Sequence, residues 1–391
     1  MVTAAEIRDE ESLKAWLEGR PAAVAVLAAR VVLRVAPIAL RFPVGHERDQ
    51  DATTFPILRS VLICGIASKR PTPQLGVMAA SASRLAVAGA ASALRSAIGT
   101  DDTYDDPSAI LSNVATDLVI TSATAVASVA SRATPIAPIA ATGTFARLAA
   151  RFQTWEEVRE DARALESEDD LLQRPLWSIP APDWFREADA AMRALWQADP
   201  AYAFWLRWWD GVLSGHQIDW TLQEKVATLI PDEVWQQGAE AVAAEIARIE
   251  EQLRLLREVE RLTEQLASAR SEIAALSRRG HNNPPELVEP VAEIERQASE
   301  ISKALEEAAQ ELKSDVPRPS VLRRVGRALL NATAKLLIYC ATLGDVALRS
   351  TAVAAGTAAG PILVAKLTGH WQEVQSLAKA LLAIARSLGG G

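Results

Sequence analysis

Residues 287–314, with the sequence LVEPVAEIERQASEISKALEEAAQELKS, carry the most regular hydrophobic pattern in this chain. Apolar side chains recur there in alternating steps of four and three residues, at Leu287, Val291, Ile294, Ala298, Ile301, Leu305, Ala308 and Leu312. A stripe of this kind is typical of a helix that buries one seam against a neighbouring helix. The stretch therefore predicts a long helix around which the rest of the chain is organised.

A second long helix is expected upstream, because apolar residues recur at helical spacing from Val242 to Leu276. Between Leu253 and Leu262, three successive steps of three residues predict a local overwinding of this helix. Six residues that favour turns separate the two helices: Gly280, His281, Asn282, Asn283, Pro284 and Pro285. Glycine can take the left-handed conformation that ends a helix, and proline cannot continue one, so we expect a hinge here.

The two helices together predict an antiparallel coiled-coil hairpin over residues 236–315. Its seam is expected to contain apolar side chains from both arms, namely Leu266, Ile273, Leu276, Leu287, Ile294, Ile301, Leu305 and Leu312. Such a rod performs no chemistry itself. We expect it to present a surface to a protein partner or to a second copy of the chain.

The composition favours helices throughout the 391 residues. Hydrophobic residues make up 49% of the chain but aromatic residues only 5%, and runs of β-branched residues with a period of two are missing. We therefore expect an all-α protein. Its expected parts are an alanine-rich helical domain at residues 1–150, a tryptophan-rich acidic helical connector at 151–235, the hairpin at 236–315 and a basic, apolar helical tail at 316–391.

Charge is distributed unevenly behind the net value of −8. Residues 151–235 carry a net charge of −9 and residues 236–315 carry −7, whereas residues 316–391 carry +7. The acidic main body argues against nucleic acid as a partner, because it would repel phosphate backbones. In the tail, the candidate contacts for a membrane or a protein partner are Arg323, Arg324, Arg327, Gly356, Gly360 and Trp371.

Two roles for the basic tail stay open on the sequence alone. Its charge and its amphipathic closing helix would suit the surface of an anionic membrane. The same charges would also suit the acidic hairpin of the chain itself. The tail contains two uncharged apolar runs, Leu336 to Gly344 and Ser350 to Ala365. Both are shorter than the roughly 20 residues that a membrane-spanning helix needs.

Motifs for catalysis are missing from the sequence, which has no phosphate-binding glycine loop, dinucleotide fingerprint, HExxH or CxxC. Ser214, His216 and Asp219 lie too close together in sequence to align as a catalytic triad. We therefore expect a non-enzymatic protein without metal or other cofactor. The two separate cysteines, Cys64 and Cys340, and the acidic first residues favour the cytoplasm, with peripheral attachment to the inner face of the membrane as the alternative.

One combination of motifs resembles a known group of proteins. The string RGHNNPPE at residues 279–286, preceded by the tryptophan-rich WLRWWD at residues 205–210, is similar to a family of uncharacterised bacterial helical proteins. The two motifs cover less than a tenth of the chain. The resemblance implies a bacterial origin and carries no expectation about mechanism.

These observations favour a non-enzymatic interaction or scaffold protein that uses the hairpin to bind a partner or itself. The alternative hypothesis is a membrane-associated or membrane-perturbing effector that acts through residues 316–391. Anionic lipid would then be the partner of the tail.

Overall fold

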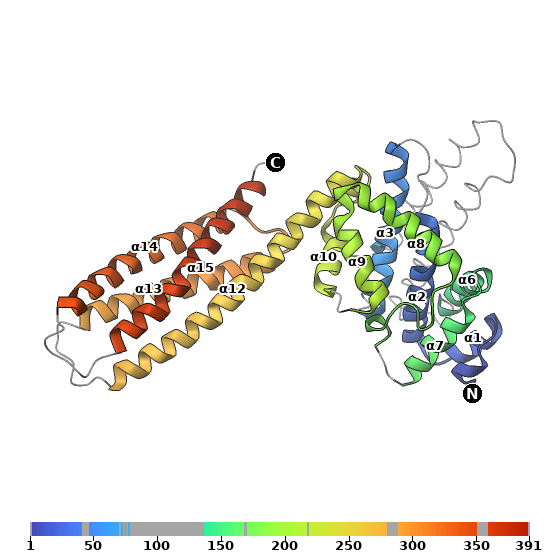
Figure 1. The fold of residues 1–391 in the computed structure, drawn as a ribbon, viewed down its shortest axis with the longest axis horizontal. Coiled ribbons are helices and arrows are strands. Elements are labelled where there is room, and N and C mark those ends of the chain that lie inside the picture. The colour runs from blue at the N-terminus through green and yellow to red at the C-terminus, as the bar shows by residue number, and fades with distance from the viewer. Residues whose placement is uncertain are drawn as a thin grey trace. The chain divides into compact units, whose positions relative to one another are not determined.

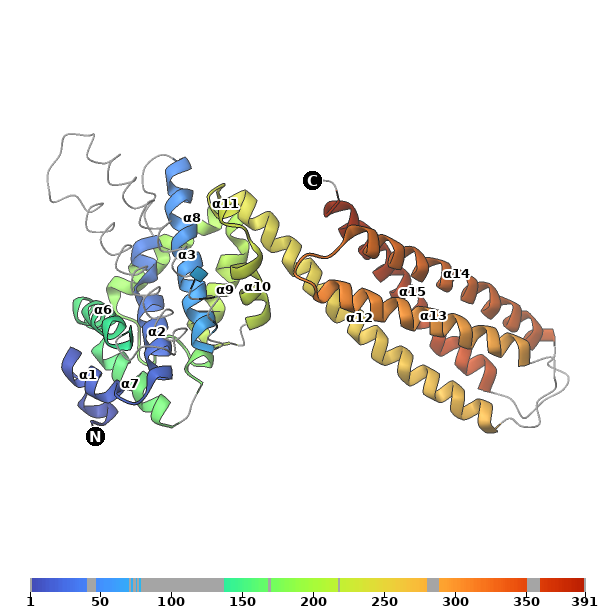
Figure 2. The ribbon, with the colours of Figure 1, turned by 180° about the vertical axis from the view of Figure 1, so that it is seen from behind.

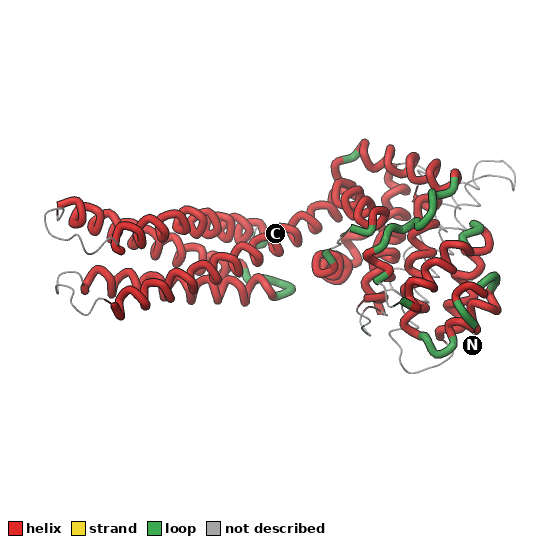
Figure 3. The backbone as a smooth tube through the Cα atoms, turned by 60° about the horizontal axis from the view of Figure 1, so that its bottom comes forward, coloured by secondary structure: helices red, strands yellow, loops and turns green. Residues whose placement is uncertain are grey.

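The chain folds into helices joined by short loops (Figure 3). The structure is a computed structural model, and it describes residues 2–40, 47–69, 72, 75, 77–78, 137–167, 170–216, 219–279, 288–349 and 359–389. Within these residues 84% are helical and none lies in a strand, which confirms the all-α class.

Two compact units divide the chain, residues 1–247 and residues 248–391, and the division falls within helix α12 (Ala239–Arg279). The structure thus groups the residues differently from the four parts that we delineated on the sequence. The physical reason is that segments with different compositions share apolar cores, as the two units show in turn.

The first unit contains nine described α-helices besides the start of α12, and three short 3-10 turns. The α-helices are α1 (Glu10–Leu17), α2 (Pro21–Leu40), α3 (Glu47–Lys69), α6 (Ala137–Arg151), α7 (Trp155–Glu166), α8 (Asp183–Ala198), α9 (Ala203–Ser214), α10 (Trp220–Leu229) and α11 (Asp232–Trp235). The 3-10 turns are η1 (Ala4–Glu6), η2 (Leu171–Gln173) and η3 (Pro200–Tyr202).

Helix α2 lies at the centre of the first unit and packs against α1, α3, α6, α7 and α8 (Figure 1). Among the described helices, only its stretch Ala22–Leu40 is long and apolar enough to cross a membrane, and 83% of that stretch is buried inside the unit. A helix that is apolar over most of its surface suits the core of a helical domain. Pro37 lies inside this helix, which continues to Leu40.

The tryptophan-rich segment forms a shared core with helix α3, which precedes it in the chain. Trp196, Trp205, Trp209 and Trp235 are at most 2% exposed. Phe55 of α3 stacks on Tyr202 with ring centroids 5.5 Å apart, and its ring lies 6.4 Å from that of Trp205. Aromatic pairs of this kind add stability beyond their buried area. Residues 151–235 therefore belong to the same unit as the helices that precede them.

The second unit is a four-helix bundle in its described part, formed by α12, α13 (Val288–Lys313), α14 (Pro319–Arg349) and α15 (Ala359–Ser387). The four helices run side by side in both Figure 1 and Figure 2. One continuous apolar core contains side chains from all of them. The larger contributors are Leu255, Val259, Leu262, Leu266, Ile301, Leu305, Leu312, Leu322, Val325, Leu329, Leu336, Trp371, Val374, Leu377, Leu381 and Ile384.

Each helix of the bundle is antiparallel to the next one along the chain. Close packing joins α13 to α14 and α14 to α15. Gln252 of α12 donates hydrogen bonds of 2.9 Å to the carbonyl oxygens of Leu312 and Ser314, at the end of α13. Arg261 of α12 pairs with Glu373 of α15 at 2.8 Å and closes the ring of helices. Residues 316–391 are consequently half of a bundle rather than a separate tail.

The two arms of the expected hairpin both enter this bundle. On α13, Ala298, Ile301, Leu305, Ala308 and Leu312 are at most 1% exposed, as the stripe predicted. On α12, Leu255 is fully buried and Leu256 only partly buried. The expected steps of three residues between Leu253 and Leu262 run through Leu256, so the buried stripe differs there from the expected one. The seam is also not closed by two helices alone, because α14 and α15 cover the same apolar faces.

Candidate functional site

Helix α14 has two opposite faces with the same spacing. Its inner face carries a buried stripe in steps of three and four residues: Leu322, Val325, Leu329, Ala332 and Leu336. Its outer face, displaced by two residues, carries an exposed stripe in steps of four and three residues: Ser320, Arg324, Arg327, Asn331 and Ala334. A displacement of two residues is about 200° around a helix, so the outer stripe points away from the core.

The start of α14 is anchored on α13 by a buried carboxylate. Glu311, whose side chain is 5% exposed, accepts a hydrogen bond of 2.5 Å from the backbone N–H of Arg318. The guanidinium of Arg318 also donates to this carboxylate, at 2.8 Å to Oε2. Hydrogen bonds from the Arg318 side chain, followed by the bond from its backbone, hold the pKa of Glu311 below its ordinary value. Glu311 thereby fixes the turn between α13 and α14.

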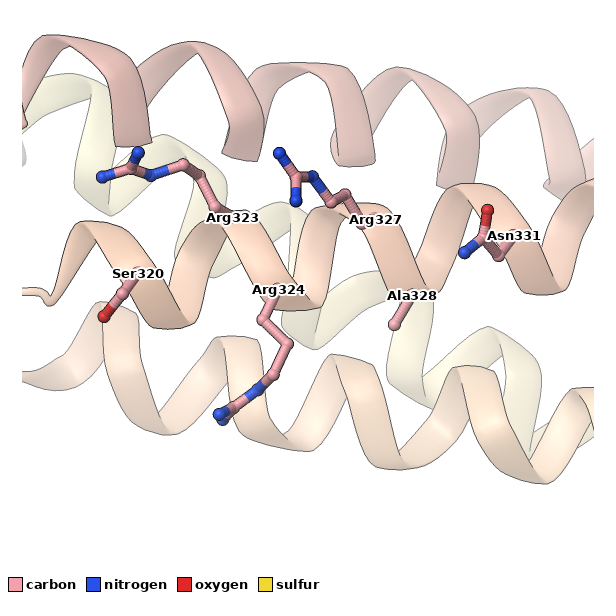
Figure 4. Close-up of a pocket in the computed structure, with 6 residues that line it drawn as sticks. All are labelled: Ser320, Arg323, Arg324, Arg327, Ala328 and Asn331. Carbon is pink, nitrogen blue, oxygen red and sulfur yellow. The ribbon is translucent and has the colours of Figure 1, made fainter.

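Three arginines follow on the exposed side of α14, and we call Arg323, Arg324 and Arg327 the arginine surface. Together with Ser320, Ala328 and Asn331 they line a shallow depression of about 550 Å³. Figure 4 shows that Arg323 and Arg327 point together toward α15, whereas Arg324 points the opposite way, toward α13. There Arg324 forms an ion pair with Glu307.

The arginine surface begins after the first turn of α14, because the helix starts at Pro319. The partial positive charge of a helix end acts within about that first turn, so the arginines themselves set the electrostatics of this surface. The Nε of Arg323 donates to the carbonyl oxygen of Pro319 at 3.3 Å. Arg327 has no carboxylate partner among the residues that the structure describes. Positive charge is therefore concentrated on the exposed side of α14, at Arg323 and Arg327.

Of the other sequence-predicted contact residues, Trp371 does not join this surface. Trp371 is 1% exposed and lies in the bundle core, so the expectation that it contacts a membrane or a partner is wrong for the folded bundle. Gly360 lies in the first turn of α15. Gly356 lies outside the described residues, as does the whole hinge from Gly280 to Pro285.

The predicted seam residues are only partly visible in the structure. Leu266, Ile301, Leu305 and Leu312 are all buried in the bundle core. Leu287 lies outside the described residues, and so do the side chains of Ile273, Leu276 and Ile294.

A buried charge cluster in the first unit escaped the sequence analysis. Arg30 and Arg34 of α2 both pair with Asp161 of α7, at 2.9 Å and 2.7 Å, and all three side chains are at most 5% exposed. Burial lowers the pKa of Arg30, against the opposing effect of Asp161. The available signal was the presence of two arginines four residues apart within the apolar run of α2.

The two arginines also hold an extended segment of the chain in place. Arg30 donates to the carbonyl oxygens of Leu171, Pro175 and Leu176 at 2.6 to 3.1 Å, and Arg34 donates to that of Leu176 at 2.9 Å. A crevice of about 20 Å³ lies beside them, which is room for a single water molecule. The cluster therefore has a structural role, and the crevice beside it is too small for a ligand.

Within the described residues, no group of three His, Cys, Asp or Glu side chains is placed to hold a metal ion. The Ser214 hydroxyl donates to the carbonyl oxygen of Asp210 at 2.7 Å, inside its own helix. The backbone N–H of His216 in turn donates to that hydroxyl oxygen at 3.4 Å. The Ser214 hydroxyl therefore forms hydrogen bonds with backbone groups at the C-terminal end of α9.

The fold defines the chain as an all-α protein whose second unit is a four-helix bundle with a basic outer helix face. Comparisons with protein-family models, with curated proteins and with solved structures find no match to this chain.

Proposed function

We propose that this chain is a non-enzymatic helical interaction protein, and that a partner binds the outer surface of its bundle. In the described part of the bundle the apolar stripes of α12, α13, α14 and α15 cover one another, which argues against self-association through an apolar hairpin seam. The bundle offers other molecules a largely charged or polar exterior, on which Val316, Leu337 and Ile338 are exposed apolar side chains. The observation that carries the proposal is the arginine surface of α14, which lines a depression and includes Arg327, an arginine without a carboxylate partner among the described residues.

Membrane association through residues 316–391 is the second candidate, favoured by their net charge of +7. It would have to use the basic exterior alone or open the bundle. The apolar face of α15, with Leu377, Leu381 and Ile384, is at most 5% exposed. Peripheral binding to an anionic surface without insertion is the form of this candidate that leaves the fold intact.

Site-specific photocrosslinking in living cells tests the proposed function. A photoreactive phenylalanine derivative would replace Ala328 in the depression, with Lys303 of α13 and Gln372 of α15 as matched exposed control positions. We expect a discrete protein adduct from position 328 that disappears when Arg323 and Arg327 are both changed to serine. Equal adducts from all three positions, or an adduct that persists without the arginines, would contradict a partner site on this face.

A further inference from the structure

We propose that the exposed face of α14 that carries Arg323 and Arg327 binds an acidic helix of a protein partner, whose carboxylates pair with these two arginines. This inference rests on the proposed function and specifies the chemistry of the partner. It follows from the spacing of the arginines, from the size of the side chains beside them and from the charges that border them.

The spacing of the two arginines fits a helical ligand. Arg323 and Arg327 are four residues apart, and their side chains extend in the same direction from α14 (Figure 4). Positions four apart on a helix are about 5–6 Å apart at Cβ, so two carboxylates one turn apart on a facing helix match both guanidinium groups. The planar guanidinium fork can bind each carboxylate through two hydrogen bonds.

The remaining outer positions allow a second helix to approach closely. Ser320, Ala328, Asn331 and Ala334 are exposed and carry small or short polar side chains. Packed helices need interaxial distances of about 8–10 Å, and small side chains at the contact permit the shorter ones. The steps of four and three residues in the outer stripe are the pattern that a partner helix can follow along several turns.

The surroundings favour a narrow acidic helix over a broad anionic surface. Glu307 borders the arginine surface through its pair with Arg324, and α13 also exposes Glu300 and Glu306. A flat anionic bilayer would meet these carboxylates together with the arginines, whereas a single helix along α14 meets mainly the arginines. The depression is also lined without any large apolar side chain that could anchor in lipid.

The test measures binding of the full chain to a synthetic helical peptide by fluorescence anisotropy. The peptide would span about three heptads and carry glutamates in steps of four and three residues on one face, with alanine, glutamine and lysine elsewhere. A second peptide of identical composition would distribute its glutamates around the helix. Vesicles containing phosphatidylserine and a single-stranded RNA oligonucleotide form the other two arms.

We expect the patterned peptide to bind, and the scrambled peptide to bind at least about fivefold more weakly. Changing Arg323 and Arg327 to serine should weaken binding of the patterned peptide by about tenfold, as expected for two solvent-exposed ion pairs. The matched control, Lys303→Ser with Lys313→Ser, removes two positive charges from α13 and should leave the affinity within about twofold. Arg323→Lys with Arg327→Lys keeps the charge but loses the fork, so it should have an intermediate effect.

Three results would overturn the inference. Equal binding of both peptides would reduce the site to nonspecific electrostatics. Tighter binding of the vesicles or of the RNA than of the patterned peptide would assign the arginine surface to lipid or to nucleic acid. If the patterned peptide does not bind but position 328 gives a specific crosslinked adduct, the acidic helix is refuted and the proposed function stands. If the peptide does not bind and no specific adduct forms, both proposals are refuted.

Discussion

The carboxylate of Asp161 on α7 holds the guanidinium of Arg30 on α2 through a hydrogen bond of 2.9 Å, across 131 residues of sequence. Its second oxygen lies 2.7 Å from Arg34, one turn further along α2. A single buried carboxylate is thus paired with two buried guanidinium groups. Backbone carbonyl oxygens of residues 171–176 accept most of the remaining hydrogen bonds from these guanidinium groups. Such clusters tolerate the loss of a member poorly, because the partners stay buried and charged.

Asp161→Asn should therefore destabilise the first unit by about 3–5 kcal/mol, since it leaves two arginines without their counter-charge. Urea denaturation followed by tryptophan fluorescence measures this, because ten of the eleven tryptophans belong to residues 1–247. Asp183→Asn is the matched control: its pair with Arg186 is exposed, so we expect a loss below about 1 kcal/mol. Similar losses of unfolding free energy in both variants would show that the buried cluster contributes no more to stability than an exposed ion pair.

A second prediction concerns Ile301 in the core of the bundle, whose side chain is 0% exposed. Ile301→Asp buries an unpaired charge among apolar side chains of all four helices and should cost several kcal/mol, roughly 3–5. Lys303→Asp introduces the same residue two positions later, where the side chain is exposed, and should cost less than about 1 kcal/mol. Circular dichroism during thermal unfolding distinguishes them. A wild-type melting temperature for Ile301→Asp would refute the burial of this stripe.

Alanine substitution at two buried helical glycines should change the free energy of unfolding in opposite directions. A Cβ atom at Gly326 of α14 would lie 2.9 Å from Cγ of Leu382 and 3.0 Å from the carbonyl oxygen of Ala378, so Gly326→Ala should separate α14 from α15. At Gly65 of α3 the nearest atom would be 3.8 Å away, in Trp220. Gly65→Ala should therefore stabilise by about 0.5–1 kcal/mol through helix propensity.

Hydrogen exchange of the two helix pairs measures this contrast directly. We expect faster exchange in α14 and α15 for Gly326→Ala, and unchanged or slower exchange in α3 for Gly65→Ala. Stabilisation of the bundle by Gly326→Ala would mean that α14 and α15 are less closely packed than the structure describes.

The carboxylate of Glu311 predicts a pH dependence for the bundle. Its pKa is lowered in the folded state, so the stability that it contributes is complete above its unfolded pKa, near 4.5, and is lost as the pH falls through the lower folded pKa. At pH 7, Glu311→Gln should cost roughly 1–3 kcal/mol, because the hydrogen bonds from Arg318 lose their charged acceptor.

The difference between wild type and Glu311→Gln should shrink as the pH is lowered below about 4.5, which denaturation at several pH values measures. Glu300→Gln, at an exposed position of α13, serves as the control. A difference that stays constant down to pH 3 would show that the charge of Glu311 does not stabilise the turn.

The helical class and the heptad stripe of α13 follow from local information, which is why they could be predicted. The spacing of Ala298, Ile301, Leu305 and Leu312 requires a buried face whatever the neighbour is. The arginine surface was also visible as three arginines near the start of residues 316–391. What the pattern could not provide was the partner of each apolar face.

Only the tertiary structure decided that residues 316–391 complete the bundle. The stripe of Leu322, Val325, Leu329 and Leu336 has the same helical spacing as that of α13, but spacing alone does not specify which helix covers it. Four amphipathic helices can bury their faces in several pairings, and the choice among them depends on contacts between residues far apart in the chain. For the same reason the sequence could not reveal that Asp161 neutralises Arg30 and Arg34, since the pairing of buried charges exists only after the helices have packed.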